Sequence, residues 1–323
     1  MLLVCAAAVA GVGYWWATKP ISLRTSPVDF RIPPGSSLRS AATQMAEAGV
    51  NVPPDLLVLL AKAARAETGI KAGSYSVNAG VTPWELLGKL TRGQVTQGEI
   101  TLVEGWTLRQ WRERIDAHPE LVHETRGLSE ADILKRLGIE GTVRAEGLFF
   151  PDTYLFDKQS SDLELFARAH RALKKKLEAE WAQRASGLPY SDPYQALIMA
   201  SIVEKETGRG ADRALVAAVF VNRLRAGMLL QTDPTVIYGM GESFDGNIRK
   251  RDLSTDTPYN TYTRPGLPPT PIAMPGLASI QAALHPADSD ALYFVARGDG
   301  SSHFSSSLEE HNRAVSRYQK GGR

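Results

Sequence analysis

The stretch VNAGVTPWELLGKL, residues 77–90, places the signals for a strand end, a turn and a helix start close together. Gly80 follows the apolar Val77 and suits a turn, because glycine adopts left-handed backbone conformations without strain. Thr82 suits the position before a helix, where its hydroxyl accepts a bond from a free backbone N–H, and Glu85 can complete a capping box. We therefore predict a strand that turns into a helix next to Thr82.

The same spacing occurs twice more, in IPPGSSLRSAATQM from residue 32 and in LVEGWTLRQWRERI from residue 102. Ser37 and Thr107 take the capping position in these copies. Apolar residues follow four and eight positions after each hydroxyl residue, which places them on one helical face: Ala41, Met45, Leu86, Leu90, Trp111 and Ile115. Residues 26–115 are therefore predicted to form strand–turn–helix units of an α+β arrangement, either a small carbohydrate-binding module or a structural spacer.

Residues 2–17, LLVCAAAVAGVGYWWA, carry no charge and end in aromatic side chains. Such a composition is typical of a membrane-spanning helix, although the run is slightly short for one. A cleaved signal peptide is the alternative, but Trp15 and Trp16 occupy the region where small residues precede a cleavage site. We therefore predict an uncleaved anchor over residues 1–18, with the rest of the chain outside the cytoplasm. Because no Lys or Arg precedes it, the positive-inside rule does not fix its orientation.

Composition excludes some classes of function. The 323 residues include 37 basic and 35 acidic side chains, so there is no electrostatic footprint of nucleic-acid binding. Cys5 is the one cysteine of the sequence, which excludes an intrachain disulfide and a cysteine-cluster metal site. The histidines are scattered without metal-binding spacing, so we predict no metal and no cofactor.

The remainder of the chain is predicted to be mixed. Residues 116–185 look mainly helical, with an interruption at EGLFFPDTYLF, residues 146–156, where a core position is favoured for Phe149 and Phe150 over a groove. Two helices follow, over 193–207 and 211–227. The last third is rich in Pro, Thr, Asn and Gly, which indicates long functional loops, and residues 291–307 suggest a hairpin.

Two glutamates occur close together in IMASIVEKETG, residues 198–208. The positions one and two turns before Glu206 are uniformly apolar, whereas those before Glu204 are smaller and mixed, so Glu206 is predicted to continue the core-facing stripe. Burial raises the pKa of a carboxyl group and suits it to general acid catalysis. From the helix alone, an equally good reading is that Glu206 bonds the turn at Thr207 and Gly208 or pairs with Arg209.

Five segments change this balance: EGLFFPDTY, ASIVEKETG, QTDPTVIYGMG, YNTYTRPGLPPTPIAMPG and ALHPADSDALYFVA. Together with the N-terminal apolar run, they closely resemble the YceG-like family, the endolytic murein transglycosylases. The resemblance covers nearly the whole chain. It implies a single-pass inner-membrane protein with an anchor (1–18), a periplasmic LysM-like subdomain (24–95) and a mixed α+β catalytic domain (96–323).

The resemblance also implies the site and the substrate. Glu206 corresponds to the family's catalytic glutamate, and Glu204 is assigned a supporting role. The substrate-binding residues implied are Gln231, Thr232, Asp233, Tyr238, Tyr259, Asn260, Thr261 and Tyr262. The substrate would be the peptidoglycan glycan strand, cut between N-acetylmuramic acid and N-acetylglucosamine with a 1,6-anhydro product, on new strands near the peptidoglycan synthases.

Two alternatives stay open at the level of the sequence. A hydrolytic muramidase would need a second carboxylate across the cleft, for which Asp233 is the candidate. A non-catalytic wall-binding scaffold would depend on the LysM-like part and leave Glu206 structural.

Overall fold

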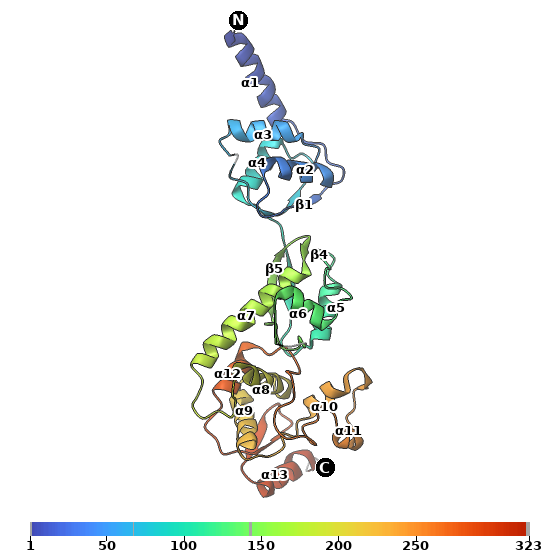
Figure 1. Ribbon diagram of the computed structural model, residues 1–323, viewed down its shortest axis with the longest axis vertical. Coiled ribbons are helices and arrows are strands. Elements are labelled where there is room, and N and C mark those ends of the chain that lie inside the picture. Colours follow the sequence, from blue (N-terminus) through green and yellow to red (C-terminus); the bar gives the residue numbers. More distant parts are fainter. Residues whose placement is uncertain (1, 67, 142–143, 321–323) are drawn as a thin grey trace. The chain divides into compact units, whose positions relative to one another are not determined.

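The computed structural model describes residues 2–66, 68–141 and 144–320, which form two compact units (Figure 1). The first unit contains Met1–Ile100, His118–His123 and Tyr154–Asp162, and the second contains Thr101–Ala117, Glu124–Thr153 and Leu163–Arg323. Helices and strands occur in both, which confirms the predicted mixed α+β class. The predicted subdomain of residues 24–95 falls within the first unit, and its LysM-like character stays a prediction.

The first unit is built around a two-stranded antiparallel sheet covered by helices. Val28 of β1 pairs with Val77 of β2, and the rings of Phe30 and Tyr75 stack on this sheet with centroids 5.7 Å apart. Two strands and three helices contribute apolar side chains to its buried core. The elements are β1 (Val28–Ile32), α2 (Leu38–Ala48), α3 (Pro54–Ala63), β2 (Gly73–Val77) and α4 (Pro83–Arg92).

The three predicted strand–turn–helix units are confirmed. Strands β1, β2 and β3 (Gln97–Leu102) end at the apolar residue of each copy, and the following glycines have φ values of 80°, 94° and 74°. Ser37, Thr82 and Thr107 each accept a bond from the backbone N–H three residues ahead, at the starts of α2, α4 and α5 (Leu108–Asp116). The predicted apolar positions of these helices are at most 1% exposed.

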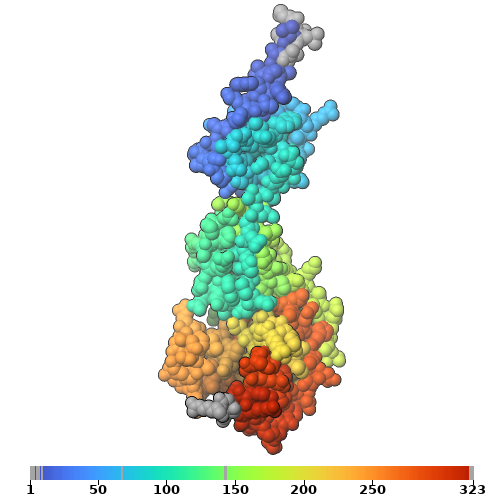
Figure 2. Space-filling model, turned by 180° about the vertical axis from the view of Figure 1, so that it is seen from behind, coloured from blue at the N-terminus to red at the C-terminus, as the bar shows by residue number. Residues whose placement is uncertain are grey.

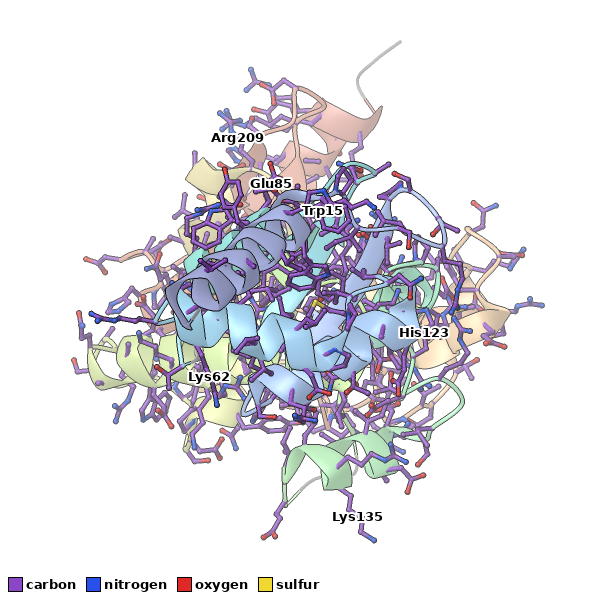
Figure 3. All side chains as sticks on the ribbon, turned by 90° about the horizontal axis from the view of Figure 1, so that it is seen from above. Trp15, Lys62, Glu85, His123, Lys135 and Arg209 are labelled. Atoms are coloured by element: carbon purple, nitrogen blue, oxygen red, sulfur yellow. The ribbon has the colours of Figure 1, made fainter. Side chains whose placement is uncertain are left out.

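Helix α1 (Leu2–Thr18) belongs to the first unit, where Trp16 packs against the buried core. Figure 3 looks onto this unit and shows Trp15 on α1 and Lys62 on α3. Tyr14 and Trp15 are exposed. Among the described residues, the structure contains no helix whose length and apolarity would let it cross a bilayer.

Short sheets and further helices complete the chain. β3 pairs with β5 (Asp152–Asp157), and β4 (Leu121–Val122) pairs in parallel with β6 (Ser160–Ser161). The predicted hairpin is confirmed as β7 (Tyr293–Ala296) and β8 (Ser302–Ser305), with Tyr293 opposite Ser305. The remaining elements are α6 (Glu130–Leu137), α7 (Asp162–Ala182), α11 (Lys250–Ser254), a 3-10 turn (Gly241–Ser243) and a π-helical turn (Ser316–Lys320). Figure 2 shows the orange segment around α11 on the surface of the second unit.

The core of the second unit is formed around α8 (Pro193–Glu206). This helix packs against α9 (Gly210–Arg225), α10 (Asp233–Met240) and α12 (Leu277–Leu284). Phe149 is fully buried between Trp111 and Phe166, so the predicted core position of the Phe pair is confirmed. Helix α13 (Leu308–Val315) contacts the β7–β8 hairpin. Helix α8 is thereby held by packing against three other helices.

Candidate functional site

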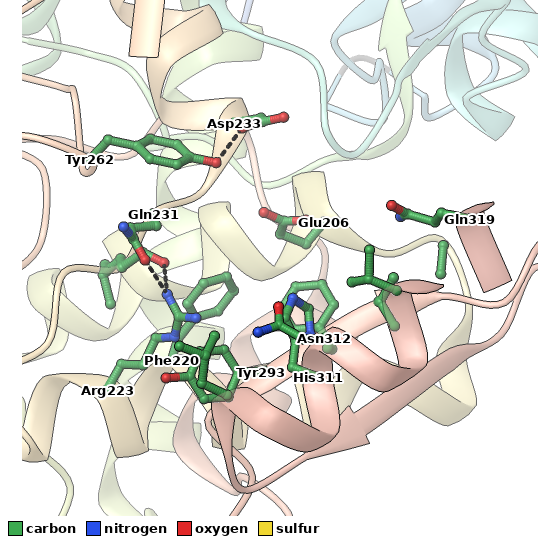
Figure 4. Close-up of a pocket in the computed structure, with 16 residues that line it drawn as sticks. Glu206, Phe220, Arg223, Gln231, Asp233, Tyr262, Tyr293, His311, Asn312 and Gln319 are labelled. Carbon is green, nitrogen blue, oxygen red and sulfur yellow. Dashed lines mark hydrogen bonds between the residues drawn. The ribbon is translucent and has the colours of Figure 1, made fainter. Parts of the chain in front are cut away.

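A cavity of about 590 Å³ lies beside the C-terminal end of α8. Its lining comes from α8, α9, the start of α10 and the residues before it, the loop between α11 and α12, strand β7 and helix α13, all within the second unit (Figure 4). Among the predicted site residues, Glu206, Gln231, Asp233 and Tyr262 line it. The structure therefore brings these four side chains, from three separate stretches of sequence, to one hollow.

Glu206 is the last residue of α8, and its carboxyl group faces this cavity. The Thr232 hydroxyl donates a hydrogen bond to Glu206 Oε1. Burial raises the pKa of Glu206 above its ordinary 4.5, the nearby Asp233 charge raises it further, and the bond from Thr232 acts in the opposite direction. A carboxyl group that keeps its proton at higher pH can act as a general acid.

The structure corrects the prediction that helical faces distinguish the two glutamates. Every residue from Ala196 to Val203 is buried, so α8 has no solvated flank along this length. The Glu204 side chain is 6% exposed. Periodicity failed here because α9, α10 and α12 enclose the helix from different directions. Glu204 and Glu206 differ in the groups that contact their carboxylates.

Glu204 meets donors and a cation. Its Oε2 accepts bonds from the Gly276 backbone N–H at 2.9 Å and from the Ser279 hydroxyl at 2.7 Å, at the start of α12. Its Oε1 lies 3.8 Å from Arg213 Nη2 of α9. Glu204 therefore connects the starts of α9 and α12 to the end of α8. This is the kind of contact that a residue in a supporting role makes.

Three of the predicted residues, Gln231, Thr232 and Asp233, lie at the start of α10, whose first residue is Asp233. Gln231 has a φ of 53°, a left-handed conformation that is uncommon for a residue other than glycine. Its backbone N–H donates to the Thr261 carbonyl at 3.1 Å. The Tyr262 hydroxyl donates to Asp233 Oδ1 at 2.5 Å. Strained backbone of this kind concentrates at functional sites.

The other predicted binding residues are not among those that line this cavity. The rings of Tyr238 and Tyr259 meet edge to face at 4.8 Å, and Tyr238 donates to Glu146 at 3.2 Å. Asn260 is fully buried, and its side-chain amide donates to three backbone carbonyls between residues 252 and 255. The Thr261 hydroxyl accepts a bond from the Thr232 N–H at 3.1 Å. These contacts support the loop that carries Tyr262. Thr232 contacts Glu206 without being among the lining residues. Substrate binding by these five residues stays a prediction.

Several functional candidates were missed from the sequence. Arg223, Tyr293, His311 and Asn312 also line the cavity. Glu146 is 4% exposed, and burial raises its pKa to about 7. A charged residue inside the apolar run VFVNRL was the available signal for Arg223. No local signal identified the others, because their partners lie far away in the sequence.

Comparisons with known proteins agree with the resemblance read from the motifs. The sequence profile of the YceG-like family matches residues 30–317. A curated protein named endolytic murein transglycosylase, from Bacillus subtilis strain 168, is 33% identical over 314 residues, covering 90% of this chain and 84% of that relative. A protein of the same name from Streptococcus pneumoniae strain D39 is 28% identical, covering 89% of this chain and 57% of the relative. A solved YceG-like protein of Listeria monocytogenes has a TM-score of 0.57 at 31% identity, covering 89% of this chain and 98% of the other.

Proposed function

The chain belongs to the YceG-like family, and we propose that it is a lytic transglycosylase acting on the glycan strands of peptidoglycan. The observation that carries the proposal is the carboxyl group of Glu206 at the cavity, which has a raised pKa and a hydrogen bond from one hydroxyl group. The curated relatives carry the name of this activity. The bond cut is the one between N-acetylmuramic acid and N-acetylglucosamine.

In the first step, protonated Glu206 donates its proton to the glycosidic oxygen while the bond to the muramyl anomeric carbon breaks. Positive charge develops on that carbon, and the 2-acetamido oxygen of the same sugar stabilises it. Within the described residues, Thr232 is the hydrogen-bond partner of the Glu206 carboxyl, through Oε1. The second oxygen is left for the substrate, and the bond from Thr232 stabilises the carboxylate that results.

In the second step, the Glu206 carboxylate removes the proton from the 6-hydroxyl of the muramyl residue. The freed oxygen bonds to the anomeric carbon and displaces the acetamido oxygen, which gives a 1,6-anhydro end and restores protonated Glu206. Atoms balance without water, and one carboxyl group serves both steps. Tyr262 and Asp233 stand at the same cavity and are assigned to hold the sugar.

Hydrolysis is the second candidate, and the observation that favours it is Asp233. This acid lines the same cavity as Glu206, and its charge raises the pKa of Glu206, so Asp233 is the candidate for the second carboxylate of a two-carboxylate mechanism. Mass spectrometry of digested peptidoglycan separates the two reactions. We expect 1,6-anhydro ends; reducing ends would show hydrolysis and overturn the transglycosylase mechanism.

The role of Glu206 is tested by Glu206→Gln, which keeps the size of the side chain and removes its proton transfer. We expect a folded protein that binds glycan strands and releases no product. Full cleavage by this variant would remove Glu206 from the chemistry. A wild-type protein that binds strands and never cleaves them would instead support a wall-binding scaffold.

We also propose that α1 anchors the enzyme in the inner membrane with its catalytic unit in the periplasm. The support is an uncharged helix that exposes Val4, Val12, Tyr14 and Trp15, side chains that water solvates poorly. Anchoring would hold the site close to new strands and to the synthases that extend them. Membranes from cells that express the full chain should retain it after an alkaline wash, and release into the wash would refute the anchor.

A further inference from the structure

Arg223 is a buried cation at the cavity whose charge is not neutralised by the groups around it. It is 8% exposed and lies on α9. Its Nε donates to the Leu292 carbonyl at 2.7 Å, and its Nη1 donates to the carbonyls of Leu229 and Leu230 at 3.2 and 2.9 Å and to Gln231 Oε1 at 3.3 Å. All four acceptors are neutral. Within the described residues, no carboxylate forms an ion pair with Arg223, and its Nη2 has no hydrogen-bond partner.

Two acids, Glu206 and Asp233, line the same cavity, but within the described residues neither forms an ion pair with Arg223. Arg223 is the one Lys or Arg among the described lining residues. Burial lowers the pKa of His311, and the Arg223 charge lowers it further. The Tyr293 ring lies 5.1 Å from the guanidinium and supplies a π face, which attracts a cation without neutralising it. Buried charges are normally paired, because desolvation of an isolated charge is costly.

Arg223 lines the same cavity as Glu206, the proposed general acid. Figure 4 shows Arg223 and Gln231 in the same hollow that Glu206 faces. Tyr262 lines the same cavity as Glu206 and Arg223. A ligand that reaches Glu206 with its glycosidic oxygen can therefore extend another group past Tyr262 towards Arg223.

We propose that Arg223, through its free Nη2, binds a carboxylate carried on the lactyl side arm of the muramyl residue. This inference rests on the proposed action on peptidoglycan strands, and it goes further by naming the part of the substrate that this end of the cavity recognises. The muramyl sugar is distinguished from its glucosaminyl neighbour by that side arm. The carboxylate is either the lactyl group's own or one of the peptide attached to it, and both offer a guanidinium the same charge-assisted bond.

A purely structural role accounts for part of this arrangement. The bonds from Nε and Nη1 fix the segment Leu229–Gln231 to the end of the loop before β7. A structural role alone leaves Nη2 without a function. An uncharged hydrogen-bond donor could hold the same segment without placing a positive charge at the cavity. Substrate preference therefore separates the two roles, because anchoring of the loop affects all strands equally.

The test measures kcat/KM of the full chain on three kinds of strand. The first carries stem peptides, the second is stripped so that each lactyl group ends in a carboxylate, and the third is stripped and converted to the neutral lactyl methylamide. We expect the strand with the recognised carboxylate to exceed the methylamide by about tenfold to a hundredfold, the range of one hydrogen bond to a charged group. Preference for the second kind identifies the lactyl carboxylate, and preference for the first alone identifies the peptide.

Gln231→Glu places a counter-charge 3.3 Å from the guanidinium without changing the shape of the side chain. Its expected effect is a fall of about tenfold or more in the ratio of carboxylate to methylamide rates. Because the ratio is taken within one variant, effects on the acid itself cancel. Arg223→Lys keeps the charge and loses the planar fork, so an intermediate ratio is expected. Arg225→Gln, at an exposed position on the same helix, is the control and leaves the ratio unchanged.

Equal rates of the wild type on all three strands would overturn the inference while leaving the proposed function intact. A ratio in Gln231→Glu equal to that of the wild type would overturn the assignment to Arg223. Failure of the proposed function would appear differently, as reducing ends in the product or as the absence of cleavage on any strand.

Discussion

Glu146 is a buried acid whose ionisation should destabilise the second unit. It stands in the turn between α6 and β5, where Leu108 N–H donates to both of its oxygens at 3.0 and 3.1 Å and Tyr238 donates at 3.2 Å. Burial is the largest cause that raises its pKa from 4.5 to about 7. Replacement by Gln keeps an acceptor for Leu108 and a donor for Tyr238, and it removes the charge.

The magnitude follows from the two pKa values. The folded protein holds the Glu146 proton more tightly than the unfolded chain does, so the stability that it contributes is present below pH 4.5 and is lost as the pH rises to about 7. At 1.36 kcal/mol per pKa unit, the loss is about 3 kcal/mol. Glu146→Gln has no such loss, so its free energy of unfolding relative to the wild type should rise by about 3 kcal/mol between pH 4.5 and pH 8.

Urea unfolding at several pH values, followed by tryptophan fluorescence, measures this difference. Trp111 is fully buried and lies 6.2 Å from Phe149, so its emission reports on the unit that contains Glu146. Glu178→Gln, at an exposed position paired with Lys174, is the matched control and should show a difference that does not vary with pH. A difference between Glu146→Gln and the wild type that stays constant from pH 4.5 to pH 8 would refute the reasoning.

Three further outcomes are expected. Glu204→Gln leaves Arg213, whose side chain is 13% exposed, without its counter-charge, so urea unfolding should show a loss of about 3 kcal/mol or more; a loss below about 1 kcal/mol would contradict this. Thr232→Val removes the bond that lowers the pKa of Glu206, so the alkaline limb of the pH–rate profile should move to higher pH, whereas a limb that stays or moves down would exclude this role. Gln231→Gly relieves a left-handed backbone, so the melting temperature should hold or rise while turnover falls; a protein both less stable and fully active would oppose this.

Sequence reasoning succeeded where the determining contacts are local. The caps at Ser37, Thr82 and Thr107 involve partners three residues away, and their glycines and apolar positions follow from the same short spacing. The hairpin at residues 291–307 was predictable for the same reason. Local steric and hydrogen-bond rules decide such features before any tertiary contact forms.

Sequence reasoning failed where the environment is assembled from distant segments. The face of α8 on which Glu204 lies is closed by α12, whose bonds to it come from residues more than 70 positions away. Glu146 reaches Tyr238 across 92 positions, and Arg223 reaches Leu292 across 69. Periodicity reports how apolar a helix face is and carries no information on which distant donors will meet a buried carboxylate.

The unequal surroundings of the two glutamates on α8 have a consequence for engineering. Glu204 is provided with a cation and two donors, whereas Glu206 is held in a desolvated position with one hydroxyl. Selection for heat resistance alone would therefore retain Glu204 and favour neutral replacements of Glu206, the side chain that we propose transfers the proton. A heat-resistant variant of this enzyme has to be selected for activity and thermal stability together, because the two properties favour different side chains at position 206.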